Sequence, residues 1–396
     1  MIERGMTNLG MTELGRDEAE LQTLGALWTA REIAQQPAML RKTQAMLLAD
    51  KVALGGFLRP LLESAATRVI LSGAGTSAFI GECLAPHFAA SLPCRLEAVA
   101  TTDLVAAPHL YFERDAPTLL VSFGRSGDSP ESVAALELAD QFVTNVQHLV
   151  ITCNRQGALA QKAAASGRGK VILLPEATLD QSFAMTSSFS CMLVAAQSAL
   201  SGIDSLSARV DRIASAVETV IATQSQTMKS FAARSYERVV YLGSHVFKGL
   251  AREAALKMLE LTDGGAIAIH DTPLGFRHGP KTIVNARTLV VIFLSNHPYT
   301  RRYDLDLLEE IRRDGKAGGL LAIAGRDAGI PAGVERILVP AMADARDVDL
   351  LIPYIAAPQI FAFEQAVMRG LSPDKPNTAG TVNRVVQGVR IHPFAP

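Results

Sequence analysis

The chain has 396 residues, 48% of them hydrophobic, and this length suits two domains of roughly 150 residues or more each. Its 38 Lys and Arg residues nearly balance its 39 Asp and Glu residues, so the charge gives no reason to expect nucleic acid as a partner. No apolar run approaches the ~18 residues of a membrane helix, and the N-terminus lacks the apolar core of a signal peptide. The four Cys residues show no CxxC spacing, which is typical of reduced thiols, so we predict a cytoplasmic protein.

The first part of the chain is a loose tail of about a dozen residues followed by a helical pattern over 29–49. We assign 1–44 to this N-terminal tail and helix. A second long helical pattern, over 203–223, is expected to connect two larger units.

Eight short apolar runs, each bounded by Gly, Pro or polar residues, follow in chain order. The first two runs of each half match at one constant offset, because Arg68 and Arg238 each open a run, as do Thr118 and Thr288. Continuous apolar strands that alternate with helices are typical of parallel sheets covered on both faces. We therefore predict an α/β protein with two tandem doubly wound parallel-sheet domains, over 45–205 and 206–396, and with ligands at the carboxyl ends of the strands. The eight runs are 68–73, 118–123, 148–153, 170–175, 238–243, 288–293, 320–325 and 336–341.

The segment 118–132, TLLVSFGRSGDSPES, carries the strongest functional signal. An apolar strand stops at a loop of Gly and Ser, and a helix opens at Pro130. Gly127 lets backbone amides point inward, and hydroxyls such as those of Ser126 and Ser129 surround the turn. Free amides, small hydroxyls and a helix N-terminus together favour a phosphate monoester. An ordinary capped strand-to-helix turn is the alternative.

A second hydroxyl-rich turn, SGAGTSAFIGE, follows the first strand, and in it Thr76 and Ser77 open a helix. Two such turns at neighbouring strand ends can converge on one phosphate. The glycine spacing is not that of a dinucleotide fingerprint, and the Lys-Ser/Thr ending of a nucleoside triphosphate loop is missing. The corresponding loop of the second half, FLSNHPYT, has no Ser-Gly turn, so we expect one phosphate site per chain, in the first unit.

The second half supplies candidate groups for proton transfer. Glu253, Lys257 and Glu260 are spaced by four and three residues and so share one helical stripe, for which a solvated, salt-bridged face is the alternative. His278 lies in GFRHGP, where it is either a proton shuttle or simply an exposed loop residue. No pair of His residues has metal-ligand spacing, so we expect neither a metal nor a cofactor.

The order of the motifs GAGTS, S-G-x-S, AMTSSF, REAALKMLELT and FRHGP resembles the sugar isomerase (SIS) domain proteins, which have a flavodoxin-like fold. The two units together are similar to the isomerase half of glucosamine-6-phosphate synthase and to its deaminase relatives. The ending, SPDKPNTAGTVNRVVQGVRIHP, most resembles the galactosamine-6-phosphate deaminase/isomerase group, long labelled tagatose-6-phosphate ketose/aldose isomerase. The likeness covers nearly the whole chain from about Thr29, and the combination of motifs makes it specific.

The resemblance implies a role for each matching residue. Glu260 would move a proton between C1 and C2 of the sugar, and His278 would open the sugar ring from a second subunit of a homo-oligomer, either a dimer or a dimer of dimers. Two positions depart from the synthase pattern: Gly124 replaces a hydroxyl residue, and Asn383-Arg384 stands where the synthase uses a Lys. The implied contacts with the phosphosugar are Thr76, Ser77, Arg125, Ser126, Gly127, Ser129, Glu253 and Lys257.

The resemblance predicts an enzyme that converts galactosamine 6-phosphate and water to tagatose 6-phosphate and ammonia. The phosphate would anchor the sugar, one carboxylate would transfer the proton between adjacent carbons, and the resulting ketimine would be hydrolysed. A ketose/aldose isomerase of a non-amino hexose 6-phosphate and a glucosamine-6-phosphate deaminase are alternatives. A non-catalytic sugar-phosphate-binding regulator is an alternative from a different class, and the near-zero net charge argues against a DNA-binding one.

Overall fold

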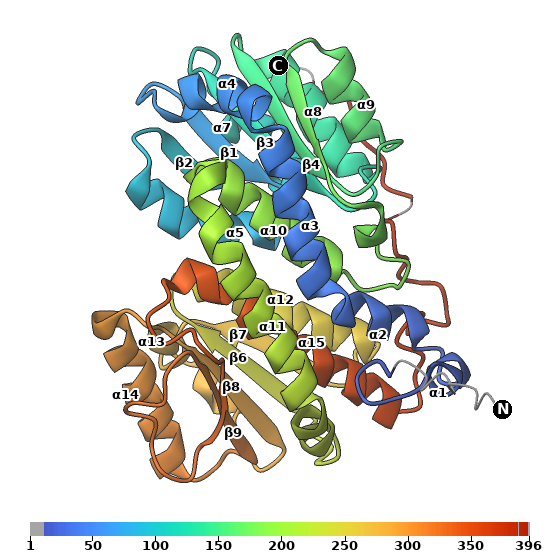
Figure 1. The fold of residues 1–396 in the computed structure, drawn as a ribbon, viewed down its shortest axis with the longest axis vertical. Helices are drawn as coiled ribbons and strands as arrows, with labels where there is room; N and C mark the ends of the chain where they lie inside the picture. Colours follow the sequence, from blue (N-terminus) through green and yellow to red (C-terminus); the bar gives the residue numbers. More distant parts are fainter. Residues whose placement is uncertain (1–11, 387, 395–396) are drawn as a thin grey trace, which may run out of the picture.

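The structure, a computed structural model, describes residues 12–386 and 388–394. It contains two five-stranded sheets, ordered β2-β1-β3-β4-β5 and β10-β9-β8-β6-β7, in which every strand pair is parallel. Figure 1 shows the two sheets as separate units with helices packed around each, which confirms the predicted tandem α/β fold. The strands are β1 (Arg68–Ser72), β2 (Arg95–Ala98), β3 (Thr118–Gly124), β4 (Val146–Thr152), β5 (Gly169–Leu173), β6 (Arg238–Gly243), β7 (Ile267–Asp271), β8 (Thr288–Leu294), β9 (Gly319–Ala324) and β10 (Glu335–Leu338).

All eight predicted apolar runs form strands, and the central strand pairs of the two sheets share one register. β1 pairs with β3 so that Arg68 is the partner of Thr118, and β6 pairs with β8 so that Arg238 is the partner of Thr288. The constant offset in the sequence therefore marks the same strand pairing in both halves. Read from β2 and from β7, the two sheets also have the same strand order.

The sequence analysis missed two strands, β2 and β7, and both lie at an edge of their sheet. Their sequences, RLEA and IAIHD, mix polar and apolar residues, and each strand has one buried residue only. An edge strand has a single neighbour and is less completely covered, so it does not need the continuous apolar run that identifies a central parallel strand.

Fifteen α-helices and two short 3-10 helices cover the sheets in the described part of the chain. They are α1 (Glu18–Thr23), α2 (Leu27–Ala34), α3 (Gln36–Ala49), α4 (Lys51–Leu62), α5 (Thr76–Ser91), α6 (Thr101–Ala106), α7 (Pro108–Tyr111), α8 (Pro130–Phe142), α9 (Ala158–Ala165), η1 (Glu176–Thr178), α10 (Ser187–Ser201), α11 (Ile203–Ala232), α12 (Val246–Leu261), α13 (Pro273–Phe276), η2 (Pro280–Ile283), α14 (Pro298–Asp314) and α15 (Asp347–Met368).

Helices α3, α10, α11, α12 and α15 lie between the two sheets, and the largest apolar cluster runs through both halves (Figure 1). Helices α5 and α12 approach each other closely, since a Cβ on Gly249 would come within 2.7 Å of the Cys83 backbone nitrogen. Arg252 on α12 forms an ion pair with Glu82 on α5 in the same region. The helix that follows the first strand of each sheet is therefore packed against its counterpart from the other half.

The C-terminal segment after α15 returns from the second half to the first (Figure 1). The Asp374 carboxylate accepts hydrogen bonds from the Trp28 and Thr29 backbone amides, at 3.1 and 2.8 Å, at the start of α2. Further on, Phe394 packs edge-on against Phe142 of α8, with ring centroids 4.9 Å apart. This path carries residues from the end of the chain across the carboxyl edge of the first sheet.

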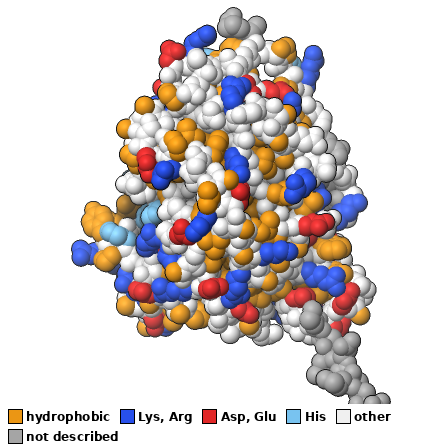
Figure 2. All heavy atoms as spheres, turned by 45° about the horizontal axis from the view of Figure 1, so that its top comes forward, with side chains coloured by type: hydrophobic (Ala, Val, Ile, Leu, Met, Phe, Trp, Pro, Cys, Tyr) orange, Lys and Arg blue, Asp and Glu red, His pale blue; other side chains and the backbone are white. Residues whose placement is uncertain are grey.

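In the described residues, α15 is the one helix long and apolar enough to cross a membrane, and 94% of its apolar window is buried inside the protein. Its composition therefore fits a central core helix. All four Cys residues are free and buried, as expected for small apolar side chains. Figure 2 shows acidic and basic side chains mixed over one face of the molecule, in keeping with the net charge of −1.

Candidate active site

A cavity of about 240 Å³ lies at the carboxyl edge of the first sheet, where the β1–α5 and β3–α8 turns meet α12 and the C-terminal segment. It brings together seven residues that the sequence singled out, which come from both halves of the chain. The seven are Thr76, Ser77, Arg125, Ser126, Gly127, Ser129 and Glu260. The other lining residues are Ala74, Gly75, Phe123, Gly124, Ser132, Phe183, Met185, Leu256, Val382, Asn383, Arg384 and Val386.

The β1–α5 turn places two hydroxyls at the N-terminus of α5. Gly75 precedes the helix with φ of +56°, a conformation that favours glycine, and Thr76 and Ser77 form the first helical turn. A Cβ on Gly73 would lie 2.6 Å from the Ser77 Cβ, so only glycine allows the helix to start this close to the strand. The turn thus presents two hydroxyls at a helix N-terminus to the cavity, an arrangement that stabilises an anion.

The β3–α8 loop adds a second helix N-terminus. Ser129 is the N-cap residue of α8, yet its side chain makes no capping bond, so the hydroxyl is available to a ligand in the cavity. The Asn154 side-chain amide holds the loop from behind by donating to the Ser126 carbonyl at 2.9 Å. Ser132, one turn into α8, also lines the cavity. The loop is therefore braced with its hydroxyls around one space.

Helix α12 brings the carboxylate. Glu260 lines the cavity, whereas Glu253 and Lys257 are fully buried behind it. The Lys257 ammonium donates to the Thr76 hydroxyl at 3.0 Å and forms an ion pair with Glu260. Lys257 therefore links the β1–α5 turn of the first half to the Glu260 carboxylate of the second half.

Burial and neighbouring charges shift the pKa values of Glu253 and Lys257 on α12. Burial raises the pKa of Glu253 to about 8, and Lys257, whose Nζ lies 3.5 Å from its carboxylate, offsets only part of this effect. Burial opposes the charge on Lys257, but Glu253 and Glu260 outweigh it and raise its pKa. At neutral pH, Glu253 therefore holds a proton while Lys257 and Glu260 form the ion pair.

Arg125 and Arg384 meet at one side of the cavity. The Arg125 guanidinium donates to the carbonyls of Ser182, Phe183 and Arg384, at 3.2, 3.1 and 2.8 Å. Burial and the neighbouring charge of Arg384 lower the pKa of Arg125. The side chain of Arg125 thus fastens two chain segments beside the cavity and adds positive charge there.

The sequence analysis did not give Asn383 and Arg384 a role, although it noted that they depart from the synthase pattern. Both residues line the cavity, and Arg384 also donates to the Asp180 carbonyl. Their place depends on the path of the C-terminal segment across the first half. The signal in the sequence was the cationic residue near a position where related enzymes carry a Lys.

Two buried carboxyl groups support the cavity wall. Asp180 caps α10 by accepting from the Thr186 and Ser188 amides, both at 2.9 Å. Glu32 accepts from the Ser182 amide at 3.1 Å, and burial together with the charge of Asp180 raises its pKa to about 8. These bonds fix the 180–186 segment, which carries Phe183 into the cavity lining.

His278 lies elsewhere. It follows α13, its side chain is exposed, and it is not among the residues that line the cavity of its own chain. Within residues 12–386 and 388–394, no group of three or more His, Cys, Asp or Glu residues is placed to hold a metal ion. The chemistry that the cavity offers is therefore anion binding by hydroxyls and helix N-termini next to the Glu260 carboxylate.

Comparisons with known proteins show the family and the fold of the chain. The SIS domain family matches residues 61–201. An Escherichia coli D-galactosamine-6-phosphate deaminase AgaS is 46% identical over 93% of this chain and 96% of its own, and one from Shewanella sp. (strain ANA-3) is 43% identical over 95% and 94%. The crystal structure of tagatose-6-phosphate ketose/aldose isomerase from Escherichia coli superposes with a TM-score of 0.86 at 43% identity, over 93% of this chain and 97% of that one.

Proposed function

The chain belongs to the AgaS family of D-galactosamine-6-phosphate deaminases, whose SIS domain it carries, and from that membership we propose that it converts D-galactosamine 6-phosphate and water to D-tagatose 6-phosphate and ammonia. One observation carries the proposal: Glu260 shares a cavity with two hydroxyl-rich helix N-termini. An anion site and a carboxylate base that line one cavity suit the isomerisation of a hexose 6-phosphate.

The phosphate is bound by the first half of the chain. Hydroxyls of Thr76, Ser77, Ser126 and Ser129 and the amides at the starts of α5 and α8 surround it, and Arg125 and Arg384 add positive charge. The phosphate is remote from the reacting carbons, so its binding energy holds C1 and C2 of the opened sugar in place.

Glu260 then moves the proton. It removes the proton from C2 of the open-chain amino aldehyde while the C1 oxygen takes a proton from water, which gives an enolamine with a hydroxyl at C1. The protonated carboxyl returns its proton to C1, and the nitrogen of the resulting ketiminium returns a proton to the hydroxide, which leaves a ketimine at C2. Water adds to the ketimine carbon, ammonia leaves, and the ketose phosphate remains. Lys257 holds the Glu260 carboxylate in place beside the sugar, because the two side chains form an ion pair.

The protein is proposed to act in the cytoplasm as a homo-oligomer in which His278 of one chain opens the sugar ring in the cavity of another. An exposed His278 outside its own chain's cavity is consistent with this role. Neutral imidazole and imidazolium are both populated near neutral pH, so a His residue can shuttle the ring-opening proton.

The test is ammonia release by the purified chain with galactosamine 6-phosphate, compared with glucosamine 6-phosphate at equal concentration. We expect ammonia and tagatose 6-phosphate in equal amounts, a higher kcat/KM for the galacto sugar, and loss of both products in Glu260→Gln. Faster turnover of the gluco sugar would make the chain a glucosamine-6-phosphate deaminase. Interconversion of hexose phosphates without ammonia would make it a plain ketose/aldose isomerase, and calorimetric binding without turnover would make it a sensor.

A further inference from the structure

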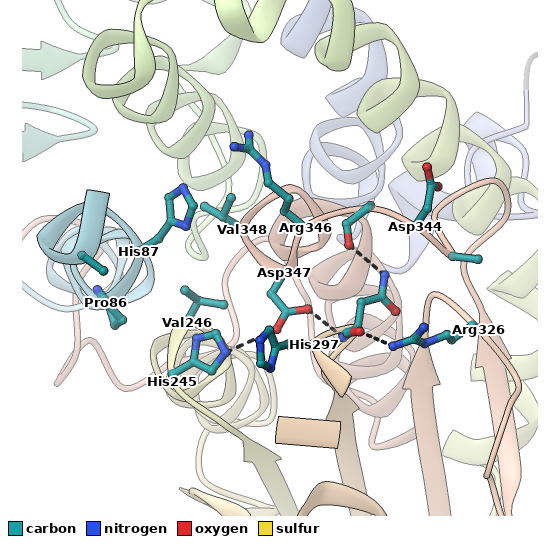
Figure 3. A pocket seen from close by; sticks show the side chains of 14 residues that line it. Pro86, His87, His245, Val246, His297, Arg326, Asp344, Arg346, Asp347 and Val348 are labelled. Atoms are coloured by element: carbon teal, nitrogen blue, oxygen red, sulfur yellow. Dashed lines mark hydrogen bonds and ion pairs between the residues drawn. The ribbon is translucent and has the colours of Figure 1, made fainter. Parts of the chain in front are cut away.

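A second cavity, of about 460 Å³, lies at the carboxyl edge of the second sheet. Figure 3 shows His87 and His245 on one side of it, Arg346 above them and Arg326 on the other side. The lining of this cavity also includes Asn296 and His297, which follow β8, and Ala90 on α5. Nothing in the proposed deaminase reaction uses this cavity.

The second cavity occupies the position of the first in the other half. Shifted by the offset that relates Arg68 to Arg238, His245 corresponds to Gly75 and Asn296 corresponds to Ser126. The first cavity is closed by α12 from the second half, and the second cavity is closed by α5 from the first half.

The residues that would do chemistry are replaced in the second cavity. Ala90 stands at the position that corresponds to Glu260, and His87 at the position that corresponds to Lys257. This cavity therefore lacks the carboxylate that would carry the proton transfer in the first cavity. It retains the location and the size of a ligand site, so binding is the function left to it.

The backbone at the mouth of the cavity is strained. His245 precedes α12 with φ of +36° and ψ of −102°, close to the +56° and −129° of Gly75 before α5. A side chain at positive φ is disfavoured, and such residues concentrate where function requires them. This conformation directs the imidazole into the lining, where its Nε2 lies 3.3 Å from Asp347.

The charges in the lining favour an anion. Arg326 donates to the Asn296 carbonyl, and among the described residues no carboxylate lies within ion-pair distance of it. The two lining carboxylates are already engaged, Asp347 by the Asn296 amide at 2.7 Å and Asp344 by Arg212. Burial and the charge of Arg346 lower the pKa of His87.

Polar partners for a sugar are present as well. Asn296 is nine-tenths buried, and its side-chain oxygen has no hydrogen-bond partner. The helices α12, α14 and α15 begin at residues of the lining or directly after them, so three N-termini face the same region. An amide oxygen accepts a hydroxyl, whereas guanidinium groups and helix N-termini take an anion.

From this geometry we propose that the second cavity is a non-catalytic binding site for a phosphate monoester of a sugar or polyol. The site is independent of the function proposed for the first cavity. It also revises the expectation of one phosphate site per chain, which counted Ser-Gly turns and therefore did not consider a site built from Arg and His side chains.

The experiment counts binding events by calorimetry with galactitol 6-phosphate, which has no carbonyl and cannot react, and with inorganic phosphate. Ala90→Glu places a carboxylate in the second cavity that has no Lys partner, because His87 stands where Lys257 pairs with Glu260. Ala89→Glu adds the same charge next to it, outside the lining. Arg326→Gln and Arg302→Gln form a second matched pair, since Arg302 is exposed and outside the lining.

We expect two galactitol 6-phosphate molecules per wild-type chain. Ala90→Glu and Arg326→Gln should weaken one of the two events by about ten-fold or more, while Ala89→Glu and Arg302→Gln leave both unchanged. Ser126→Ala should weaken only the other event. A single binding event per chain would overturn the proposal, and so would two events whose affinities change in neither Ala90→Glu nor Arg326→Gln. Equal affinity for inorganic phosphate and galactitol 6-phosphate would overturn the sugar part of it. Absence of ammonia release would count against the deaminase proposal alone.

Discussion

The two cavities of this protein occupy corresponding positions in two similar sheets, yet only one has the groups for catalysis. The first has hydroxyls on its turns and Glu260 on the helix from the other half, whereas the second has imidazoles and guanidiniums and an Ala at the corresponding helix position. The fold provides a place for a ligand at each sheet edge. A few side chains decide whether that place can move a proton.

The buried stripe on α12 shows the difference most clearly. Glu253 and Lys257 lie behind Glu260 in the first cavity, and the corresponding residues of α5 are Cys83 and His87. The charged stripe therefore exists on one helix only. Because each cavity is closed by a helix from the other half, the close packing of α5 against α12 positions both sites at once.

Glu260→Gln should have the largest effect, since it removes from the first cavity the carboxylate that the second cavity lacks at the corresponding position. The amide keeps the size of the side chain but cannot take the proton, so we expect kcat for ammonia release to fall by roughly 100-fold or more. The affinity for galactitol 6-phosphate should change little. Glu137→Gln, on the exposed face of α8, is the matched control. If the Glu260→Gln enzyme remained active, a residue other than Glu260 would have to be the base.

Mixing inactive chains tests whether the first cavity needs a second subunit. If His278 serves a neighbouring chain, hybrids of Glu260→Gln and His278→Ala chains contain one intact site per dimer, because both substitutions fall in the other site. With random exchange, we expect recovery to about a quarter of wild-type activity. Mass spectrometry would verify that subunits exchange. Hybrids that form and stay inactive would show that each site is built from a single chain.

Ser126→Ala removes one proposed phosphate contact from the first cavity and none from the second. We expect KM to rise by about ten-fold or more while kcat changes little, because the hydroxyl contacts the phosphate in the ground state and the transition state alike. Ser122→Ala, which removes a buried hydroxyl from the same strand-to-loop segment outside the lining, is the control. An unchanged KM would mean that the 118–132 loop does not bind the phosphate.

The central strands and the hydroxyl turns could be predicted from sequence, because both are local patterns. A buried parallel strand needs a continuous apolar run, and a strand-to-helix turn that binds an anion needs small residues at fixed places. Edge strands such as β2 carry no such run and were missed. Glu260 could be placed on a stripe, but its position over the β1–α5 turn depends on the packing of α12.

Arg384 and the second cavity were beyond these local patterns. Arg384 reaches the first cavity because Asp374 and its neighbours guide the C-terminal segment past α2, and these are contacts over more than 300 residues. The second cavity has no hydroxyl-rich turn that would mark it in the sequence. Its lining combines residues from α5, from the loops after β8 and β9, and from the starts of α12 and α15. Such sites follow from the path of the chain and not from any one segment of it.

The buried carboxyl of Glu253 gives a last, smaller test of the difference between α12 and α5. Its pKa is raised from an ordinary 4.5 to about 8, so the folded chain holds a proton that the unfolded chain has released in this range. The free energy of unfolding should therefore fall as the pH rises from about 5 to 8, by up to about 1.4 kcal/mol per pH unit from this group. Glu253→Gln mimics the protonated form, so it should match the wild type at pH 5 and be the more stable of the two at pH 8.

Burial raises the pKa of the corresponding Cys83 thiol, which stays neutral throughout, so Cys83→Ala should change stability by the same amount at both pH values. Urea titrations of the three proteins at pH 5 and pH 8 would measure this, and a gap between wild type and Glu253→Gln that does not widen with pH would mean that Glu253 is ionised in the folded protein.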